Sequence, residues 1–298
     1  MGCSARRCQP WLGTYVEVAA QAPDEAVLER AIQSAFDSVA RVHRLMSFHD
    51  PASDVSRLNR HASHSPVTVD AWTHEVLGEA QRMHLLSGGI FDVAIAPSLI
   101  AWGFLPDKHV PTEGRGTTAE VDLMTKRRVR FHRSLTLDLG GIAKGFAVDR
   151  AVEALQAAGI SSGSVNAGGD LRVFGPRPQP LRVRHPGQPT KTLVVGELRD
   201  EAAATSAACF SRRRHAGRWV SPILDPFTAR PWLGRASITV IAPSCLQADA
   251  LTKIIALAPE GAPAILTDCG ARAIIVADAK PSNSRLMCGP LSPCTLAA

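Results

Sequence analysis

Several short segments of this sequence carry residue types that suit phosphate or metal chemistry. The first is Gly140-Gly141-Ile142-Ala143-Lys144-Gly145. Glycines let the backbone approach a ligand closely, and the first N–H groups of a helix have no internal partner. Lys144 adds a positive charge at that point, so the turn suits a phosphate, although it lacks the spacing of a Walker A loop. A plain glycine turn with a solvated lysine is the alternative interpretation.

A second segment, Asn166-Ala167-Gly168-Gly169-Asp170, lies between two predicted strands. Glycines and an acidic residue at a strand end are typical of ligand sites in loops. A tight turn closed by an Asx side chain explains the same residues without any function.

A third segment begins at Asp249, with Thr252 and Lys253 about one helical turn later. Carboxylate, hydroxyl and carbonyl oxygens are the ligands that Mg²⁺ prefers. The alternative is an aspartate that interacts favourably with the helix dipole and pairs with Lys253 four residues on.

Two further positions close predicted strands: Thr205-Ser206 and Asp225. Ligands often bind at such ends, although ordinary turns have the same composition. The histidines and cysteines show no zinc-ligand spacing, and no Gly-x-Ser-x-Gly elbow of a serine hydrolase is present.

The elements that must position these residues follow from the apolar pattern. Helical spacing predicts helices over 24–45, 73–86 and 247–257, and another that starts after Lys144 and ends near residue 158. The segment 50–65 is predicted as a loop or broken helix. Strands are predicted at 15–19, 129–131, 135–137, 164–166, 171–174, 181–183, 193–198, 219–224, 238–241 and 273–277.

Most strands of the second half are too close together to be joined by helices, which indicates an antiparallel sheet. We therefore expect an α+β fold: one compact domain over 10–280, with a mainly antiparallel sheet and flanking helices. The segment 106–118 is expected to be a surface loop, and 281–298 a loosely held tail.

The composition limits the classes of function that the protein can have. A net charge of +6, with 45% hydrophobic and 20% charged residues, excludes disorder and fits a modest anionic ligand. Only 5% of residues are aromatic, which argues against a nucleic-acid binder that stacks bases. No signal peptide or membrane span is visible, so the expected location is the cytoplasm, or the periplasm if a leader was removed.

Taken in order, the motifs resemble those of the ApbE family, the FAD:protein FMN transferases. The resemblance covers about 12–257 and rests on the following segments: Leu12-Gly13-Thr14, Met46-Ser47, 53–59, Phe91-Asp92, Trp102-Gly103-Phe104, 137–149, 165–170, Thr205-Ser206, Asp225-Pro226 and 248–251. It implies a Mg²⁺-dependent enzyme that cleaves the pyrophosphate of FAD. FMN would pass to a Thr or Ser of a target flavoprotein, and AMP would be released.

The resemblance also implies residue roles. Asp138 and Lys144 would contact FAD, with Lys144 near the phosphates, and Thr205-Ser206 would border the flavin. The pocket for adenosine or flavin would include Ile90, Phe91 and Asp92. The metal would be held by Asp249 and by the main-chain carbonyl of Gly141.

Three positions depart from the family pattern near the flavin and the acceptor. Leu12 stands where the family has Met, and His49 falls where a tyrosine commonly flanks the flavin. Pro222 replaces the histidine of the His-Ile-Ile-Asp-Pro motif, a proposed base for the acceptor hydroxyl. His215 or Asp225 would have to serve as that base instead.

A fourth departure affects the metal. The family's Thr, four residues after the aspartate, is Lys253 here, on the same helix face as Asp249. Either Lys253 replaces part of the cation's charge, or Thr252 supplies the lost oxygen and Lys253 points at phosphate. In both cases we expect a lower affinity for Mg²⁺ than in typical relatives.

The sequence is also compatible with two other functions. Pro222 and Lys253 would also suit an FAD-binding protein that has lost transfer, and an FAD pyrophosphatase would release free FMN and AMP. A nucleic-acid partner is not expected.

Overall fold

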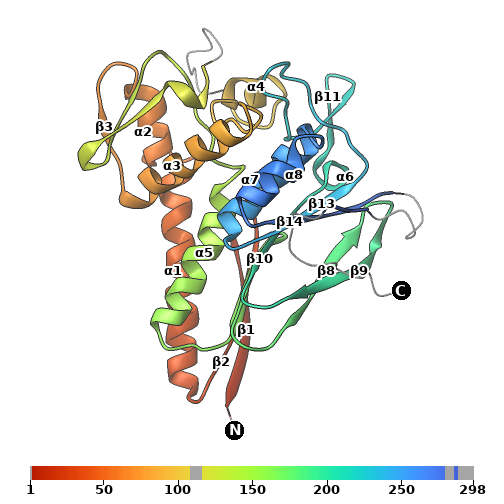
Figure 1. Cartoon of the computed structure of the whole chain (residues 1–298). Helices are drawn as coiled ribbons and strands as arrows, with labels where there is room; N and C mark the ends of the chain where they lie inside the picture. The colour runs from red at the N-terminus through yellow and green to blue at the C-terminus, as the bar shows by residue number, and fades with distance from the viewer. Residues whose placement is uncertain (1, 108–115, 279–284, 288–298) are drawn as a thin grey trace.

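The computed structural model describes residues 2–107, 116–278 and 285–287. Its central element is an eight-stranded sheet in which the neighbouring strands are all antiparallel (Figure 1). The strands, in their order across the sheet, are β1 (Cys3–Trp11), β2 (Thr14–Ala22), β6 (Gly163–Ala167), β7 (Asp170–Phe174), β10 (Ala202–Ser206), β13 (Ser237–Ala242), β14 (Arg272–Val276) and β15 (Arg285–Met287).

Three long helices cover one face of this sheet (Figure 1). Helix α1 (Glu25–Met46) packs on β1 and β2, α5 (Ala143–Ala157) on β6 and β7, and α7 (Cys245–Leu257) on β10 and β13. The remaining helical segments are α2 (Asp54–His61), α3 (Ala71–Leu86), α4 (Ala96–Ala101), α6 (Ala208–Ser211), α8 (Ala262–Asp268), η1 (Thr118–Glu120) and η2 (Thr125–Arg127).

The opposite face is partly covered by a hairpin of β8 (Gln179–His185) and β9 (Gln188–Leu198) (Figure 1). Successive side chains of a strand point to opposite faces, and β10 shows this clearly. Ala203 packs with the hairpin, whereas Ala202 and Ala204 pack with the helices. The central strands are therefore buried on both faces, which explains their continuous apolar runs.

Two smaller sheets complete the fold. One joins β3 (Val67–Thr68), β5 (Arg128–Phe131) and β4 (Val121–Met124), and the other is the hairpin of β11 (Arg213–His215) and β12 (Arg218–Val220). Both are antiparallel. The predicted α+β class, with a mainly antiparallel sheet and flanking helices, is confirmed.

Some local predictions were wrong. The segment 135–137 is not a strand, because the side chain of Asn59 takes the place of a neighbouring strand: its amide bonds to the main-chain O and N of Leu137, at 2.9 and 2.8 Å. Strand β1 was not predicted. The strand predicted at 219–224 ends at Val220.

Two expected segments lie partly outside the described residues. Of the tail 281–298 only Arg285–Met287 is described, and this segment pairs with β14 as an edge strand. The loop 106–118 is described only at its two ends. Among the helices of the described residues, none combines the length and the hydrophobicity that a membrane span requires.

Candidate functional site

A cavity of about 1130 Å³ opens between the helices, the loops beside them and the sheet. Its wall includes the end of α1, the loop after α3, the turn before α5, the β6–β7 turn and part of β8. The predicted site residues that line it are Leu12, His49, Ile90, Phe91, Asp92, Asp138, Gly141, Lys144, Thr205, Ser206 and Lys253. Asp249 and Thr252 are buried next to this wall, in α7.

The start of α5 meets the start of α7 with almost no space between the two backbones. A Cβ built on Gly145 would lie 2.2 Å from the main-chain O of Cys245, so only glycine fits there. This close approach brings the first turn of α5, which carries Lys144, next to Asp249 of α7.

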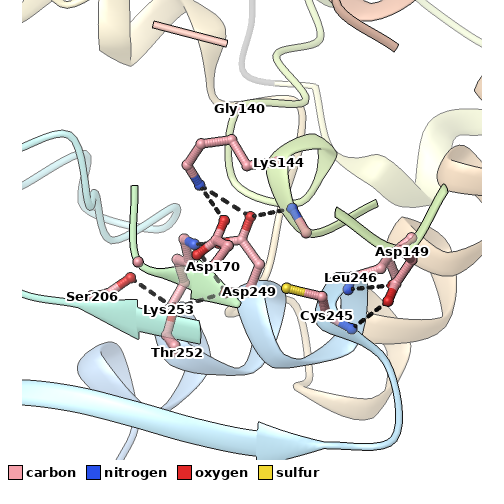
Figure 2. Close-up of polar contacts among 12 residues, drawn as sticks. Gly140, Lys144, Asp149, Asp170, Ser206, Cys245, Leu246, Asp249, Thr252 and Lys253 are labelled. Carbon is pink, nitrogen blue, oxygen red and sulfur yellow. Dashed lines mark hydrogen bonds and ion pairs between the residues drawn. The ribbon is translucent and has the colours of Figure 1, made fainter. Parts of the chain in front are cut away.

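Asp149 fixes the same helix pair one turn further along α5. Its buried carboxylate accepts hydrogen bonds from the main-chain N–H groups of Cys245 and Leu246, at 3.0 and 2.9 Å (Figure 2). These are groups at the start of α7 that have no partner within the helix. Arg172 pairs with Asp149 at 2.6 Å, so the capping carboxylate is itself neutralised.

The centre of the site is a cluster of two carboxylates and two ammonium groups (Figure 2). Lys144 Nζ lies 2.9 Å from Asp170 Oδ2 and 3.2 Å from Asp249 Oδ2. Lys253 Nζ forms an ion pair with Asp249 Oδ1 and lies 2.9 Å from the main-chain O of the same residue. Asp170 is 3% exposed and Asp249 is 1% exposed.

Burial and mutual contact shift the titration of these groups. Burial and the neighbouring Asp249 raise the pKa of Asp170 to about 6. Burial alone would also raise the pKa of Asp249, but Lys144 and Lys253 outweigh it and hold that pKa below its ordinary value. Burial opposes the charge of Lys144, yet Asp170 and Asp249 raise its pKa above the usual range. Lys144 and Asp249 are therefore charged at neutral pH.

The donor set around Asp249 does not fit a magnesium ion. Both carboxylate oxygens accept from ammonium groups, and Thr252 Oγ1 bonds to Asp249 O at 2.7 Å and to Ser206 Oγ at 2.8 Å. Mg²⁺ requires a near-octahedral shell of oxygens at about 2.0–2.1 Å. Across residues 2–107 and 116–278, no group of three or more His, Cys, Asp or Glu side chains is arranged to hold a metal.

Of the two outcomes considered for Lys253, the geometry supports the replacement of cationic charge. Thr252 is fully buried and does not line the cavity, so its hydroxyl is not available to a ligand there. Lys253 does line the cavity, with its ammonium group on Asp249.

Asp92 and Phe91 form the part of the wall that follows α3. The Asp92 carboxylate accepts from Ala94 N at 2.7 Å and from Thr118 Oγ1 at 2.8 Å. Burial raises its pKa in spite of these bonds. His84 Nδ1 lies 2.9 Å from Phe91 O, which holds the loop against α3.

Asp138 lies in the turn before α5, at a position fixed by the bonds of Asn59 to Leu137. Its Oδ2 accepts from Gly140 N at 3.1 Å. Burial raises the pKa of Asp138, although Gly140 N–H, His49 and Lys144 oppose the shift.

The remaining predicted contacts lie on the cavity wall. Thr205 Oγ1 is bonded to Thr239 Oγ1 at 2.9 Å, and Ser206 to Thr252. Leu12, with a φ of 56°, forms the tight β1–β2 turn with Gly13. Ile90 is half-buried and His49 is exposed.

The two predicted bases do not line the cavity, whereas Pro222 does. The Asp225 carboxylate closes a turn, accepting from the main-chain N–H groups of Phe227 and Thr228 at 2.8 and 3.0 Å. His215 lies on β11 beside Gly103, the residue before Phe104 of the cavity wall. His215 is therefore near the cavity wall without lining it. The assignment of either residue as a base stays a prediction.

The sequence singled out the segment 166–170 but gave Asp170 no role, and it did not point to Arg182 or Arg184, yet all three line the cavity. The tight turn predicted for 166–170 is present, and its Asn166 Oδ1 accepts a hydrogen bond from Gly169 N at 3.0 Å. The turn places the Asp170 carboxylate in contact with the Lys144 ammonium group. A signal was available for the arginines: they alternate with apolar residues in β8 and so share one strand face.

Comparison with known proteins agrees with this architecture. A sequence profile of the ApbE family matches residues 12–275. A Vibrio cholerae protein named FAD:protein FMN transferase is 31% identical over 239 residues, covering 74% of this chain and 72% of the relative. A Haemophilus influenzae protein with the same name is 30% identical over 234 residues, covering 71% and 67%.

Solved structures extend the similarity to the whole fold. The ApbE protein of Thermotoga maritima superposes with a TM-score of 0.81 at 27% identity, covering 97% of each chain. The flavin transferase ApbE of Vibrio cholerae superposes with a TM-score of 0.79 at 26% identity, covering 97% of this chain and 98% of that one. The profile match spans most of the sequence and the fold agrees over nearly its full length, so this chain is a member of the ApbE family.

Proposed function

We propose that this protein binds FAD in the cavity and transfers its FMN half to a hydroxyl group of a target flavoprotein, releasing AMP. The observation that carries the proposal is the position of Lys144: its ammonium group lies at the start of α5, on the wall of the large cavity. Relatives named for this same transfer share the fold and most of the sequence length.

Size and charge both support FAD as the ligand. A cavity of about 1130 Å³ is larger than most sites for small ligands, which span about 300–1,000 Å³. Apolar wall residues such as Ile90, Phe91 and Leu12 suit flat ring systems. Lys144, Lys253 and Arg184 supply positive charge for the diphosphate between those rings.

In the proposed reaction, the acceptor hydroxyl oxygen forms a bond to the phosphorus of the FMN half. The P–O bond to the AMP phosphate breaks, and AMP leaves with that bridging oxygen. Lys144 orients the diphosphate and stabilises the negative charge that develops on it. Asp170 and Asp249 fix the Lys144 ammonium group in place.

The hydroxyl proton must pass to a base where the acceptor protein arrives. We assign this role to His215, because it lies beside Gly103, which directly precedes the wall residue Phe104. Asp225 is the second candidate, although its carboxylate already accepts two main-chain hydrogen bonds in a turn. Pro222 has no group that accepts a proton.

The Mg²⁺ dependence that the family resemblance implied is not supported by the donor set around Asp249. Lys253 already contacts both Oδ1 and the main-chain O of Asp249, the oxygens that a metal ion would need there. No step of the proposed reaction is assigned to a metal ion.

The test is to incubate the full chain with FAD and an acceptor flavoprotein, and to measure AMP and covalent flavin fluorescence of the acceptor. The proposal predicts both products in equal amounts. Lys144→Met, which keeps the length of the side chain without its charge, should lose both. Wild-type protein that binds FAD but yields neither product would instead be a flavin-binding protein. Free FMN with AMP and no labelled acceptor would indicate a pyrophosphatase.

A further inference from the structure

Lys253 occupies the place where a cation would meet the oxygens of Asp249. Its ammonium group contacts both the side-chain Oδ1 and the main-chain O of Asp249, which project toward it from one turn earlier in α7 (Figure 2). The side chain is 18% exposed and lines the cavity. Lys253 Cε lies 3.8 Å from the position of a Cβ built on Gly141, so the lysine packs against the glycine turn before α5.

The charges of the cluster are balanced without a metal ion. Asp170 and Asp249 supply two negative charges, and Lys144 and Lys253 supply two positive ones. Because both carboxylates are buried, removing one partner would leave a costly unpaired charge. A divalent cation at Asp249 would have to displace Lys253 and break both of its contacts with that residue.

Each ammonium group keeps capacity for a ligand. A lysine has three N–H donors, and the structure gives two acceptors to each of Lys144 and Lys253. Within the described residues, one donor of each lysine therefore remains for a phosphate oxygen. Two ammonium groups that share Asp249 are close enough together to contact the same diphosphate.

We propose that Lys253 is a built-in substitute for a divalent cation, so that this protein holds the diphosphate of FAD with Lys144 and Lys253 and without a metal. This inference rests on the proposed function for the identity of the ligand. It assigns to a side chain the charge that a bound ion would otherwise bring.

The first test measures FAD binding to the full chain by flavin fluorescence, in EDTA and in millimolar Mg²⁺. We expect the same Kd in both buffers, within about twofold, because the free N–H donors of the lysines, and not an ion, bind the diphosphate oxygens. A Kd that is about tenfold weaker in EDTA and recovers with Mg²⁺ would overturn the proposal.

Two variants sharpen the test. Lys253→Thr removes the ammonium group and offers an oxygen, so FAD binding should weaken about tenfold or more in EDTA and recover with Mg²⁺. Lys253→Met has similar length but neither charge nor oxygen, so its FAD affinity should fall equally in both buffers. If Lys253→Met bound FAD as tightly as the wild type, Lys253 would have no role at the diphosphate. Thermal unfolding verifies that both variants fold.

A measurement without FAD separates this inference from the proposed function. Mn²⁺ is a paramagnetic probe for a Mg²⁺ site, and its binding to the protein alone can be followed by electron paramagnetic resonance. We expect no binding to the wild type and measurable binding to Lys253→Thr. Tight Mn²⁺ binding by the wild type would overturn the inference, whatever the ligand. If FAD bound in neither buffer, the proposed function would fail, and the Mn²⁺ result would still decide the role of Lys253.

Discussion

At the scale of single residues, the site depends on which charges are buried together. Asp249 is almost fully buried and contacts two ammonium groups, and Asp170 shares one of them. The sequence indicated Lys144, Asp249 and Lys253 individually, because each lies in a recognisable motif. It could not indicate the contact of Asp170 with Lys144, because that contact joins β7 to α5 across 26 positions of sequence.

The raised pKa of Asp170 predicts a pH dependence of stability. Between the ordinary value of 3.8 and about 6, the folded chain binds more protons at this residue than the unfolded chain does. Its contribution therefore lowers the free energy of unfolding as the pH rises through this window. Asp170→Asn removes the titrating group, so the difference in stability between the variant and the wild type should shift in favour of the variant as the pH rises from about 4 to about 6. Urea unfolding at each pH measures this difference.

The exposed Asp200 provides the control, because Asp200→Asn should leave the pH profile of the wild type unchanged. A constant difference between Asp170→Asn and the wild type at all pH values would contradict the assigned shift.

The proposed base gives a second prediction at this scale. His215→Gln should lower the transfer rate about 10²-fold or more while the Kd for FAD stays the same, because proton transfer and flavin binding involve different groups. Asp225→Asn should keep the wild-type rate, since an amide oxygen accepts the same two hydrogen bonds from Phe227 and Thr228. Stopped reactions that quantify AMP give both rates. Unchanged transfer by His215→Gln would place the base elsewhere.

At the scale of elements, the contact of α5 with α7 positions the site. The sequence predicted both helices from their apolar spacing, because that signal is local. It did not show that Gly145 is a crossing point, or that Asp149 caps α7, because each depends on a neighbour about 100 positions away. The prediction of a strand at 135–137 was wrong for the same reason, because the partner of this segment is the distant side chain of Asn59 and not a strand.

This helix contact makes a prediction for stability and binding. Gly145→Ala would place a Cβ 2.2 Å from Cys245 O, so the helices must separate at a cost of about 1–3 kcal/mol in the free energy of unfolding. The Lys144 ammonium group would move with α5, so the affinity for FAD should also fall. Urea unfolding and flavin fluorescence measure the two effects.

Gly78 is the matched control, because it also lies in a helix, α3, and its added Cβ would meet only Leu123 at an ordinary 3.8 Å. Gly78→Ala should leave stability unchanged or raise it by up to about 1 kcal/mol. Equal effects of the two substitutions would show that the helix contact tolerates a methyl group.

At the scale of the whole molecule, the cavity forms where several distant parts of the chain meet. The end of α1, the loop after α3, the turn before α5, the β6–β7 turn and β8 all contribute to its wall. The fold class followed from the sequence because strand spacing and helix periodicity are local signals. The contribution of Arg182 and Arg184 did not, because it depends on how the β8–β9 hairpin lies against the main sheet.

The central proposal is that Lys144 and Lys253 hold the diphosphate of FAD. A crystal structure of the FAD complex, grown in EDTA, tests it most directly. We predict diphosphate oxygens within about 3 Å of both ammonium groups, with Lys253 still in contact with Asp249. A diphosphate bound away from these two lysines, or FAD absent from the cavity at saturating concentration, would contradict it.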